Sequence, residues 1–228
     1  MNVIEIDGGF AVHLDARPVK TPAKAALVVP TRSMADAVAG EWRLVVEKID
    51  PNLMPVTRSA NASIDKVATQ FGEVATMLAA YGGSDLLCYR AENPEGLVQR
   101  QTEGWDPLLD WAHATFGARL VSTVGIMPIE QSEVDLAALA APLFEASNFE
   151  LAAFHDLIAM SGSLVIALGV AQGHLTPAEA WTLSRIDETW QAEQWGADDD
   201  AAQVAEIKRA AFVHAADFYQ MASIHARG

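Results

Sequence analysis

The 228-residue sequence has very little cysteine: Cys88 is the only one. A single thiol excludes an internal disulfide and any metal cluster held by several cysteines, and it agrees with a reducing compartment. Because the neighbours of Cys88 in SDLLCYR are apolar, we expect a buried, chemically inert thiol.

Positive charge is also scarce. The chain has 15 Lys and Arg against 30 Asp and Glu, which gives a formal net charge of -15. Such a surface repels phosphate backbones and anionic lipid, and no stretch collects enough basic residues to make a local exception. We therefore expect neither nucleic acid nor a membrane surface to be a partner of this protein.

Long apolar runs and targeting segments are missing as well. The opening MNVIEIDGGF has no basic or apolar leader pattern, so we expect no signal for export or import. The most apolar segment, residues 157–171, is shorter than the roughly 20 residues that a membrane crossing needs. We expect no membrane insertion, and we expect residues 157–171 to form a buried core helix.

The composition is that of a folded protein, with 51% hydrophobic and 20% charged residues. VIEI and FAVHL, joined by DGG, predict a β-hairpin, and the prolines that follow favour short strands and turns. A three- and four-residue apolar period predicts helices over about 31–49 and 61–81. DLLCYR predicts a buried strand, and ARLVSTVGIMPI contains the last strand candidate.

The remainder of the chain has helical periodicity. A helix in LVQRQTEGWDPLLDWAHATFG is expected to be interrupted at Pro107, where a new helix can start. Further helices are predicted over about 133–145, 149–171, 177–195 and 200–225. We therefore predict an α+β protein with a mixed, strand-containing N-terminal lobe over 1–90 and a mainly helical C-terminal lobe over 91–228.

Patterns for catalysis are lacking. The histidines do not have HExxH spacing, the glycines do not have phosphate-binding spacing, and Ser161 lies inside a helical pattern. Asp198, Asp199 and Asp200 precede a helix, where aspartates cap free N–H groups, so capping is favoured over metal binding. No catalytic residue, cofactor or metal is predicted.

The segment LSRIDETWQAEQWGADDD, residues 183–200, raises a different possibility. On a helical wheel, Trp181, Glu188 and Trp195 share one stripe, and Leu183, Ile186 and Trp190 lie nearly opposite. A helix with two apolar stripes is either covered on both sides or presents one side to a partner. The periodicity leaves both alternatives open.

Three stretches carry a resemblance to a known family: LDARPVKTPAKAALVVPT, GGSDLLCYRAENPEGLVQRQTEGWDPLLDWA and LSRIDETWQAEQWG. Together they resemble the F-type ATP synthase assembly chaperone that attends the alpha subunit of the catalytic head. The resemblance covers nearly the whole chain. It implies a non-enzymatic, ATP-independent chaperone that binds the free alpha subunit, shields its beta-contacting surface and prevents aggregation before the hexamer assembles.

The resemblance also implies a partner-binding site. The resemblance maps a family signature onto Gln191, Glu193, Trp195 and Gly196. Its acidic residue, Glu193, lies two positions before the tryptophan and ranks first, and the helical wheel adds Glu188. Asp187 stands where relatives more often have Glu. The full expected set is Glu193, Glu188, Gln191, Trp190, Trp195, Gly196 and Asp187. The chain resembles a bacterial, cytoplasmic member that is a monomer when free, whereas eukaryotic relatives work in the mitochondrial matrix.

Two other classes of function remain as alternatives. One is a small-molecule enzyme with a carboxylate-lined pocket between the two lobes, in which Glu188 or Glu193 acts as general base beside a histidine such as His155. The other is a permanent structural subunit of a complex. Stable co-purification with a finished complex would indicate the latter.

Overall fold

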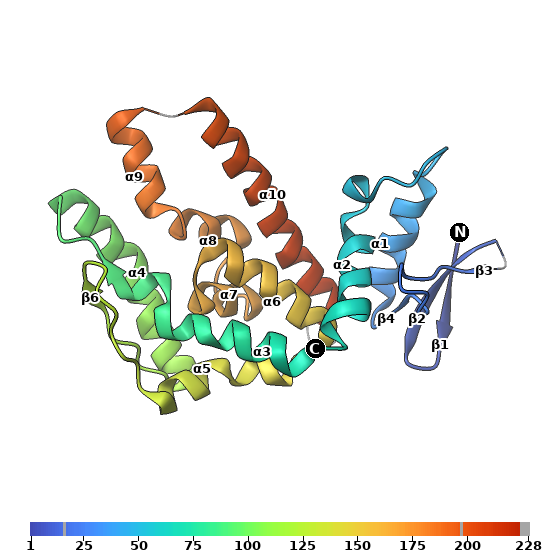
Figure 1. Cartoon of the computed structure of the whole chain (residues 1–228), viewed down its shortest axis with the longest axis horizontal. Coiled ribbons are helices and arrows are strands. Elements are labelled where there is room, and N and C mark those ends of the chain that lie inside the picture. The colour runs from blue at the N-terminus through green and yellow to red at the C-terminus, as the bar shows by residue number, and fades with distance from the viewer. Residues whose placement is uncertain (16, 197, 224–228) are drawn as a thin grey trace. The chain divides into compact units, whose positions relative to one another are not determined.

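The computed structural model describes residues 1–15, 17–196 and 198–223. Contacts divide the chain into two compact units. Unit 1 comprises Met1–Val74, Ala146–Ala153 and the described part of His214–Gly228, and unit 2 comprises Ala75–Glu145 and Phe154–Val213. Strands gather near the N-terminus and helices make up most of the rest (Figure 1), which confirms the predicted α+β class. The predicted lobe boundary near residue 90 stays a prediction.

The predicted β-hairpin of unit 1 is confirmed. Strand β1 (Asn2–Ile6) pairs antiparallel with β2 (Gly9–Leu14), and β2 also pairs with the short strands β3 (Arg17–Pro18) and β4 (Val28–Val29). Gly9 has a φ of 143°, and a Cβ there would lie 2.4 Å from the Val29 carbonyl oxygen. Glycine is therefore needed where β2 and β4 approach.

Helix α1 (Arg32–Arg43) begins as predicted, because the Thr31 hydroxyl accepts a hydrogen bond from the Met34 N–H group. The predicted end near residue 49 is wrong. The Glu41 carboxylate accepts hydrogen bonds from the Val56 and Thr57 N–H groups, so the chain turns back after Arg43. A 3-10 turn (Pro51–Leu53), α2 (Pro55–Ala62) and a π-helical turn (Ser63–Val67) follow.

The core of unit 1 forms between the hairpin and these helices. It is made of apolar side chains from β2 and β4, from α1 and α2, and from two later helices, and its largest members include Leu27, Met34, Phe149 and Phe218. The predicted helix 61–81 is divided: α3 (Phe71–Ala79) begins only after residues 68–70 leave the helix.

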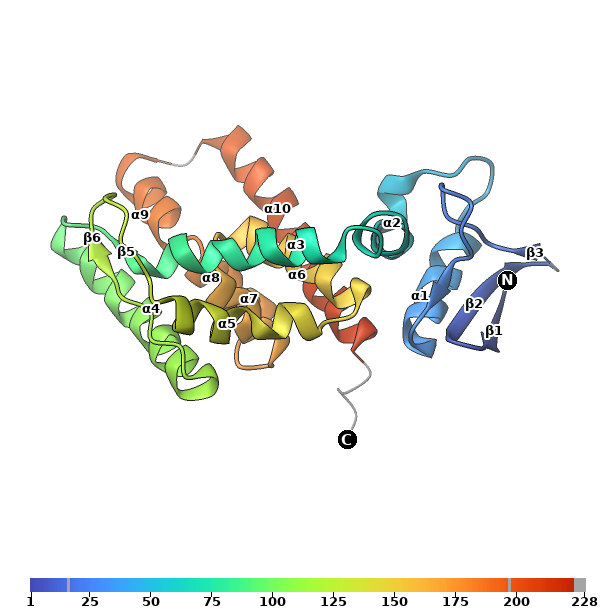
Figure 2. The same cartoon turned by 60° about the horizontal axis from the view of Figure 1, so that its bottom comes forward.

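Unit 2 is built mainly of helices (Figures 1 and 2). Short 3-10 turns (Ala80–Ser84, Leu86–Cys88) lead to β5 (Tyr89–Arg90), which pairs in parallel with β6 (Thr123–Val124). The strand expected in DLLCYR is thus only two residues long, because Asp85 caps the preceding 3-10 turn. The helices are α4 (Glu95–Phe116), α5 (Glu133–Glu145), α6 (Asn148–Ser161), α7 (Leu164–Ala171), α8 (Pro177–Leu183), α9 (Ile186–Trp195) and α10 (Asp199–Ala222).

Helix α4 runs straight through Pro107, so the predicted interruption there is wrong. Proline removes the hydrogen bond to the carbonyl of Glu103, but both residues lie on the exposed side, where water can satisfy that carbonyl. Trp105 and Leu108 are buried on the opposite side and hold the helix through this point.

The predicted helix 149–171 is two helices, since Gly162 has a φ of 73° and Ser163 caps α7. Seven residues of α7 are buried, which confirms a core helix there. Cys88 is buried as predicted, and burial raises its pKa to about 12. Of the helices that the structure describes, none has the length and apolar character needed to cross a membrane.

Candidate partner-binding surface

The predicted single helix over 177–195 is two helices, α8 and α9. The chain leaves helical geometry at Arg185, with a φ of -118°, and the Ser184 hydroxyl donates to the Trp181 carbonyl at the end of α8. The stripe expected to join Trp181 to Trp195 is therefore broken: Trp181 packs against Phe212 and is buried, whereas Trp195 is 80% exposed. The capping box that starts α8 at Thr176 is confirmed.

Helix α9 packs against α4 through small residues. A Cβ on Gly96 would lie 2.7 Å from Trp190 Cη2, and a Cβ on Gly104 would lie 2.8 Å from Ile186 Cδ1. Both distances are shorter than real Cβ contacts, so a side chain at Gly96 would displace the Trp190 ring and one at Gly104 would displace the end of the Ile186 side chain. These two glycines therefore bring α9 close to α4, and Trp190 and Ile186 form its inner face.

Arg100, one helical turn after Gly96, connects this contact to Glu193. Its Nη1 donates a hydrogen bond of 2.9 Å to the Glu193 carboxylate, and its Nη2 lies 2.7 Å from the other carboxylate oxygen. The guanidinium also stacks over the Trp190 ring, 4.8 Å from the ring centre. This bidentate geometry with a flat aromatic partner is specific to arginine. Hydrogen bonding to Arg100 lowers the pKa of Glu193, so the carboxylate is charged at neutral pH.

The other two predicted acids have different neighbours. Asp187 accepts a hydrogen bond of 2.6 Å from the side-chain amide of Gln101, which is buried. The carbonyl of that amide in turn accepts from the Ala91 N–H group. Glu188 pairs with Arg185 at 2.8 Å and is more exposed than Glu193. Asp187 thus faces the protein, and Glu188 and Glu193 reach solvent.

The outer side of α9 is open. No residue of α9 is buried, and Gln191, Trp195 and Gly196 are exposed. The first half of α10, residues 199–210, is exposed throughout, with Val204 and Ile207 at 51% and 64%. Trp195, Val204 and Ile207 are exposed apolar groups set among carboxylates, and we call the face of α9 and α10 that carries them the outer surface.

The structure brings some predicted site residues together and separates others. Glu193 and Trp190 share Arg100, Asp187 sits on the inner side, and Gln191, Trp195 and Gly196 lie toward the free end of α9. Sequence reasoning missed Gly96, Arg100 and Gln101 on α4. Gly96, Arg100 and Gly104 are spaced four residues apart, which places them on one face of a helix. This spacing is the sequence signal from which the α4 side of the contact could have been predicted.

The arrangement does not suit acid or base catalysis. A general base needs a pKa near neutrality, but Arg100 lowers the pKa of Glu193, and His155 is hydrogen-bonded to its neighbour Asp156. Asp198 accepts hydrogen bonds from the Asp200 and Ala201 N–H groups, which confirms its predicted capping role. Within the described ranges, no three His, Cys, Asp or Glu side chains are placed to hold a metal ion.

Comparison with known proteins gives a consistent result. Residues 1–113 match the family model described as ATP12 chaperone protein. The mitochondrial protein atp12 of Schizosaccharomyces pombe is 26% identical over 212 residues, which cover 87% of this chain and 72% of the relative.

Solved structures agree more closely. A crystal structure of Atp12 from Paracoccus denitrificans and a structure of a mutant of that protein are each 47% identical with a TM-score of 0.95, covering 97% of this chain and 95% of theirs. A protein from Agrobacterium tumefaciens is 40% identical with a TM-score of 0.92, covering 97% and 84%. The enzyme alternative is therefore overturned, and the chain belongs to the ATP12 family, a family of chaperones.

Proposed function

We propose that this chain assists the assembly of the F-type ATP synthase by binding the free alpha subunit of the catalytic head. It covers the surface that alpha later offers to beta, and it needs no ATP. Membership of the ATP12 family supports the chaperone class, and the resemblance of LSRIDETWQAEQWG to the alpha-subunit chaperones supports the choice of client.

The main support for placing the binding site on α9 is that this helix has no buried residue, although it contains two tryptophans. Exposed indole beside fixed carboxylate is typical of an interface anchor. Trp195 is free to enter a pocket of the client, while the Arg100 pair holds Glu193 in a defined position. We assign partner binding to Glu193, Glu188, Gln191, Trp190, Trp195 and Gly196, with Asp187 as a positioning residue.

The residue types of this surface suit transient binding to the alpha subunit. A few apolar groups mask an aggregation-prone patch, and the net charge of -15 keeps the complex soluble. Affinity stays moderate because beta has to displace the chaperone. In this proposal the free protein is a monomer in the bacterial cytoplasm; light scattering after gel filtration measures the oligomeric state.

Selective capture tests the proposal. Alpha and beta subunits expressed separately are mixed with the immobilised chain, and aggregation of isolated alpha is followed by light scattering without ATP. We expect capture of alpha alone and suppressed scattering. Capture of beta instead, or unchanged scattering, would refute the choice of client. Retention in purified ATP synthase at fixed stoichiometry would favour a structural subunit.

A further inference from the structure

Unit 1 has a pocket of about 480 Å³, and no residue of α9 lines it. This volume is within the range of sites that bind ligands or side chains of a partner. Its apolar lining includes Pro22, Trp42, Ile49, Pro51 and Met54. The turn after β3, the end of α1, the segment before α2, α2 itself and the π-helical turn all contribute residues.

Four cations surround this apolar lining: Lys20, Lys24, Arg58 and Lys66. They are four of only 15 Lys and Arg in the whole chain. Among the described residues, none of the four has a carboxylate within 4.0 Å, whereas five arginines elsewhere form such pairs. The pocket is thus a positive site on an acidic protein.

The single carboxylate in the lining does not neutralise these cations. Asp65 accepts a hydrogen bond of 2.6 Å from the Thr21 hydroxyl and one of 3.0 Å from the Ala23 N–H group. It therefore fixes the turn that carries Lys20 and Lys24. Lys24 has a φ of 70°, a backbone conformation that costs free energy for a residue with a side chain.

Two polar atoms of the lining residues lack partners. Trp42 Nε1 and Asn61 Oδ1 are buried, and neither has a hydrogen bond within the described part of the chain. Buried polar groups are paired in most native proteins. Because both atoms are closed to solvent in this structure, they do not contact the open volume of the pocket and do not identify its occupant.

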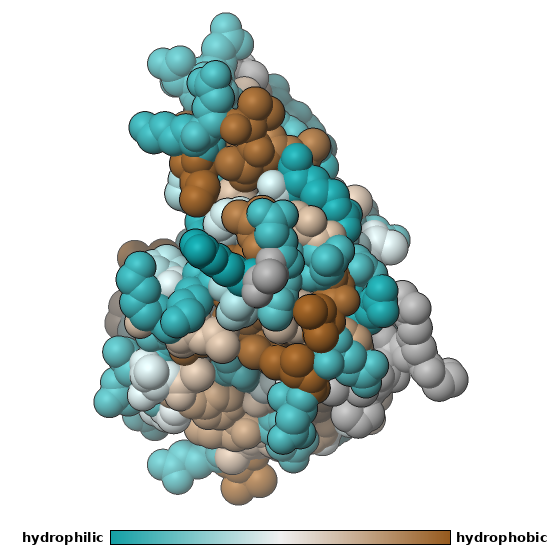
Figure 3. All heavy atoms as spheres, turned by 90° about the vertical axis from the view of Figure 1, so that its right-hand side faces the viewer, coloured by the Kyte–Doolittle hydropathy of each residue, from teal (hydrophilic) through white to brown (hydrophobic). Residues whose placement is uncertain are grey.

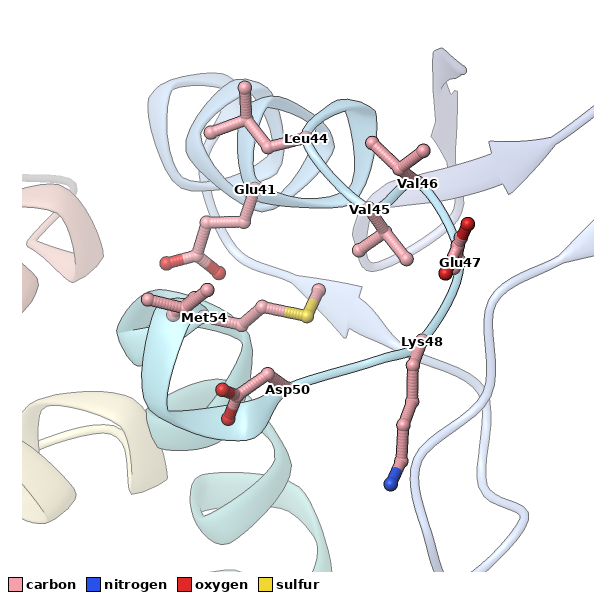
Figure 4. Close-up of a pocket in the computed structure, with 9 residues that line it drawn as sticks. Glu41, Leu44, Val45, Val46, Glu47, Lys48, Asp50 and Met54 are labelled. Atoms are coloured by element: carbon pink, nitrogen blue, oxygen red, sulfur yellow. The ribbon is translucent and has the colours of Figure 1, made fainter.

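A second pocket of about 470 Å³ adjoins the first, because Met54 lines both. Figure 4 shows Val45 and Met54 in this second pocket. Leu44 and Val46 lie on the chain segment that follows α1, above them in this view. Leu44, Val46 and Leu53 are 80%, 91% and 75% exposed. Apolar side chains also reach the surface in patches among hydrophilic ones in Figure 3.

We propose that these two pockets together bind an extended segment of the client polypeptide in which carboxylates alternate with apolar side chains. The carboxylates lie among Lys20, Lys24, Arg58 and Lys66, and an apolar side chain rests on Trp42 and Met54. The lining of the second pocket includes Glu47 and Asp50, so only apolar side chains of the segment continue there, over Leu44 and Leu53. This second docking site rests on the proposed function for the identity of the client, but its chemistry is tested without it.

A peptide fits these observations better than a small anion. Nucleotide sites are commonly built on the backbone N–H groups of a glycine-rich turn, and the sequence has no glycine-rich phosphate motif. A small anion would also leave the exposed apolar residues of the second pocket uncovered. Charge complementarity then predicts which peptides bind and how substitution changes their affinity.

Three capped octapeptides serve as probes for the full-length chain: alternating Glu and Leu, alternating Lys and Leu, and alternating Glu and Ser. Binding is followed through the indole N–H resonance of Trp42, which Trp42→Phe identifies among the six tryptophans. We expect the Glu and Leu peptide to shift this resonance and to bind at least about tenfold more tightly than the others. Equal binding of either other peptide would overturn the proposal.

Charge reversal supplies the matched control. Lys20→Glu should weaken the Glu and Leu peptide by about tenfold or more, whereas Arg17→Glu, an equal charge change on an exposed residue outside the pocket, should leave binding nearly unchanged. Arg58→Glu is the second pocket variant if Lys20→Glu fails to fold. Equal losses in the pocket variant and the control would overturn the proposal.

Two further arms separate the alternatives. ATP and inorganic phosphate are titrated against the same resonance, and displacement of the peptide by either would overturn the polypeptide site in favour of a small-anion site. Capture of the isolated alpha subunit is measured in parallel. Peptide binding without capture of alpha would refute the proposed function and leave this pocket intact, and capture of alpha without peptide binding would do the reverse.

Discussion

At the scale of single residues, Glu193 is the clearest test of the candidate surface. Its carboxylate is exposed and paired with Arg100, and exposed ion pairs contribute little to stability. Glu193→Lys should therefore leave the unfolding temperature nearly unchanged and abolish protection of the alpha subunit. Thermal unfolding and light scattering of isolated alpha measure the two effects.

The control for this variant is Asp36→Lys, which breaks the exposed Arg32–Asp36 pair of α1 with the same change in charge. It should protect alpha as well as the native chain does. If Glu193→Lys instead lowers the unfolding temperature by many degrees, Glu193 is a structural residue and its assignment to partner binding fails.

A second residue, Asp85, should make the free energy of unfolding depend on pH. It is fully buried in unit 2, where its carboxylate accepts from the Leu87 and Val165 N–H groups. Burial raises its pKa from 3.8 to about 6, although hydrogen bonds, chiefly from Ser163, act in the opposite direction. Between these two pH values the unfolded chain has already lost the proton that the folded chain keeps.

Stability contributed by Asp85 is thus fully present below about pH 4 and is lost as pH rises through 6. We expect the free energy of unfolding of the native chain, relative to Asp85→Asn, to fall by on the order of 3 kcal/mol from pH 4 to pH 7. Urea unfolding of both proteins at several pH values measures this difference. A difference that does not vary with pH would contradict a raised pKa.

At the scale of elements, the contact between α4 and α9 depends on Gly96. A methyl group there would meet the rigid Trp190 ring at 2.7 Å, so Gly96→Ala should displace α9 and cost about 1–3 kcal/mol. Gly40→Ala is the matched control, because its Cβ meets nothing within 4 Å inside α1. This control should gain up to about 1 kcal/mol from helix propensity.

Hydrogen exchange of the α9 amides gives the local readout. Gly96→Ala should speed exchange in α9, and Gly40→Ala should not. Unchanged exchange and stability in Gly96→Ala would show that Trp190 moves aside freely and that the glycine is not what seats α9.

Elements with strong local signals were predictable from the sequence. The hairpin, the start of α1 at Thr31, the capping box at Thr176 and the span of α5 all follow from adjacent residues. The errors have long-range causes: Glu41 ends α1 by binding the start of α2, and buried neighbours carry α4 through Pro107. One sequence does not display contacts between distant segments.

In the candidate surface too, residues adjacent in the chain were predictable and contacts between distant segments were not. The acids and tryptophans of α9 were found because they are adjacent in the chain, but Arg100 and Gln101 lie 93 and 86 positions away from their partners Glu193 and Asp187. The break at Arg185, which separates buried Trp181 from exposed Trp195, also depends on the packing of Trp181 against Phe212.

At the scale of the whole molecule, the net charge of -15 predicts the effect of salt. If carboxylates of the outer surface attract the client, the association rate should fall by about tenfold as salt rises from low to high concentration, because screening shortens the reach of surface charge. Stopped-flow mixing with labelled alpha subunit measures this rate. An association rate that rises with salt would indicate a contact dominated by apolar groups.

Binding of the alpha subunit to the open side of α9 is tested by hydrogen exchange of the full-length chain with and without isolated alpha. We expect slower exchange in the described residues of 186–210 when alpha is added, and no change when beta is added. Exchange in this segment that stays the same when alpha is bound, or that slows equally with beta, would contradict it.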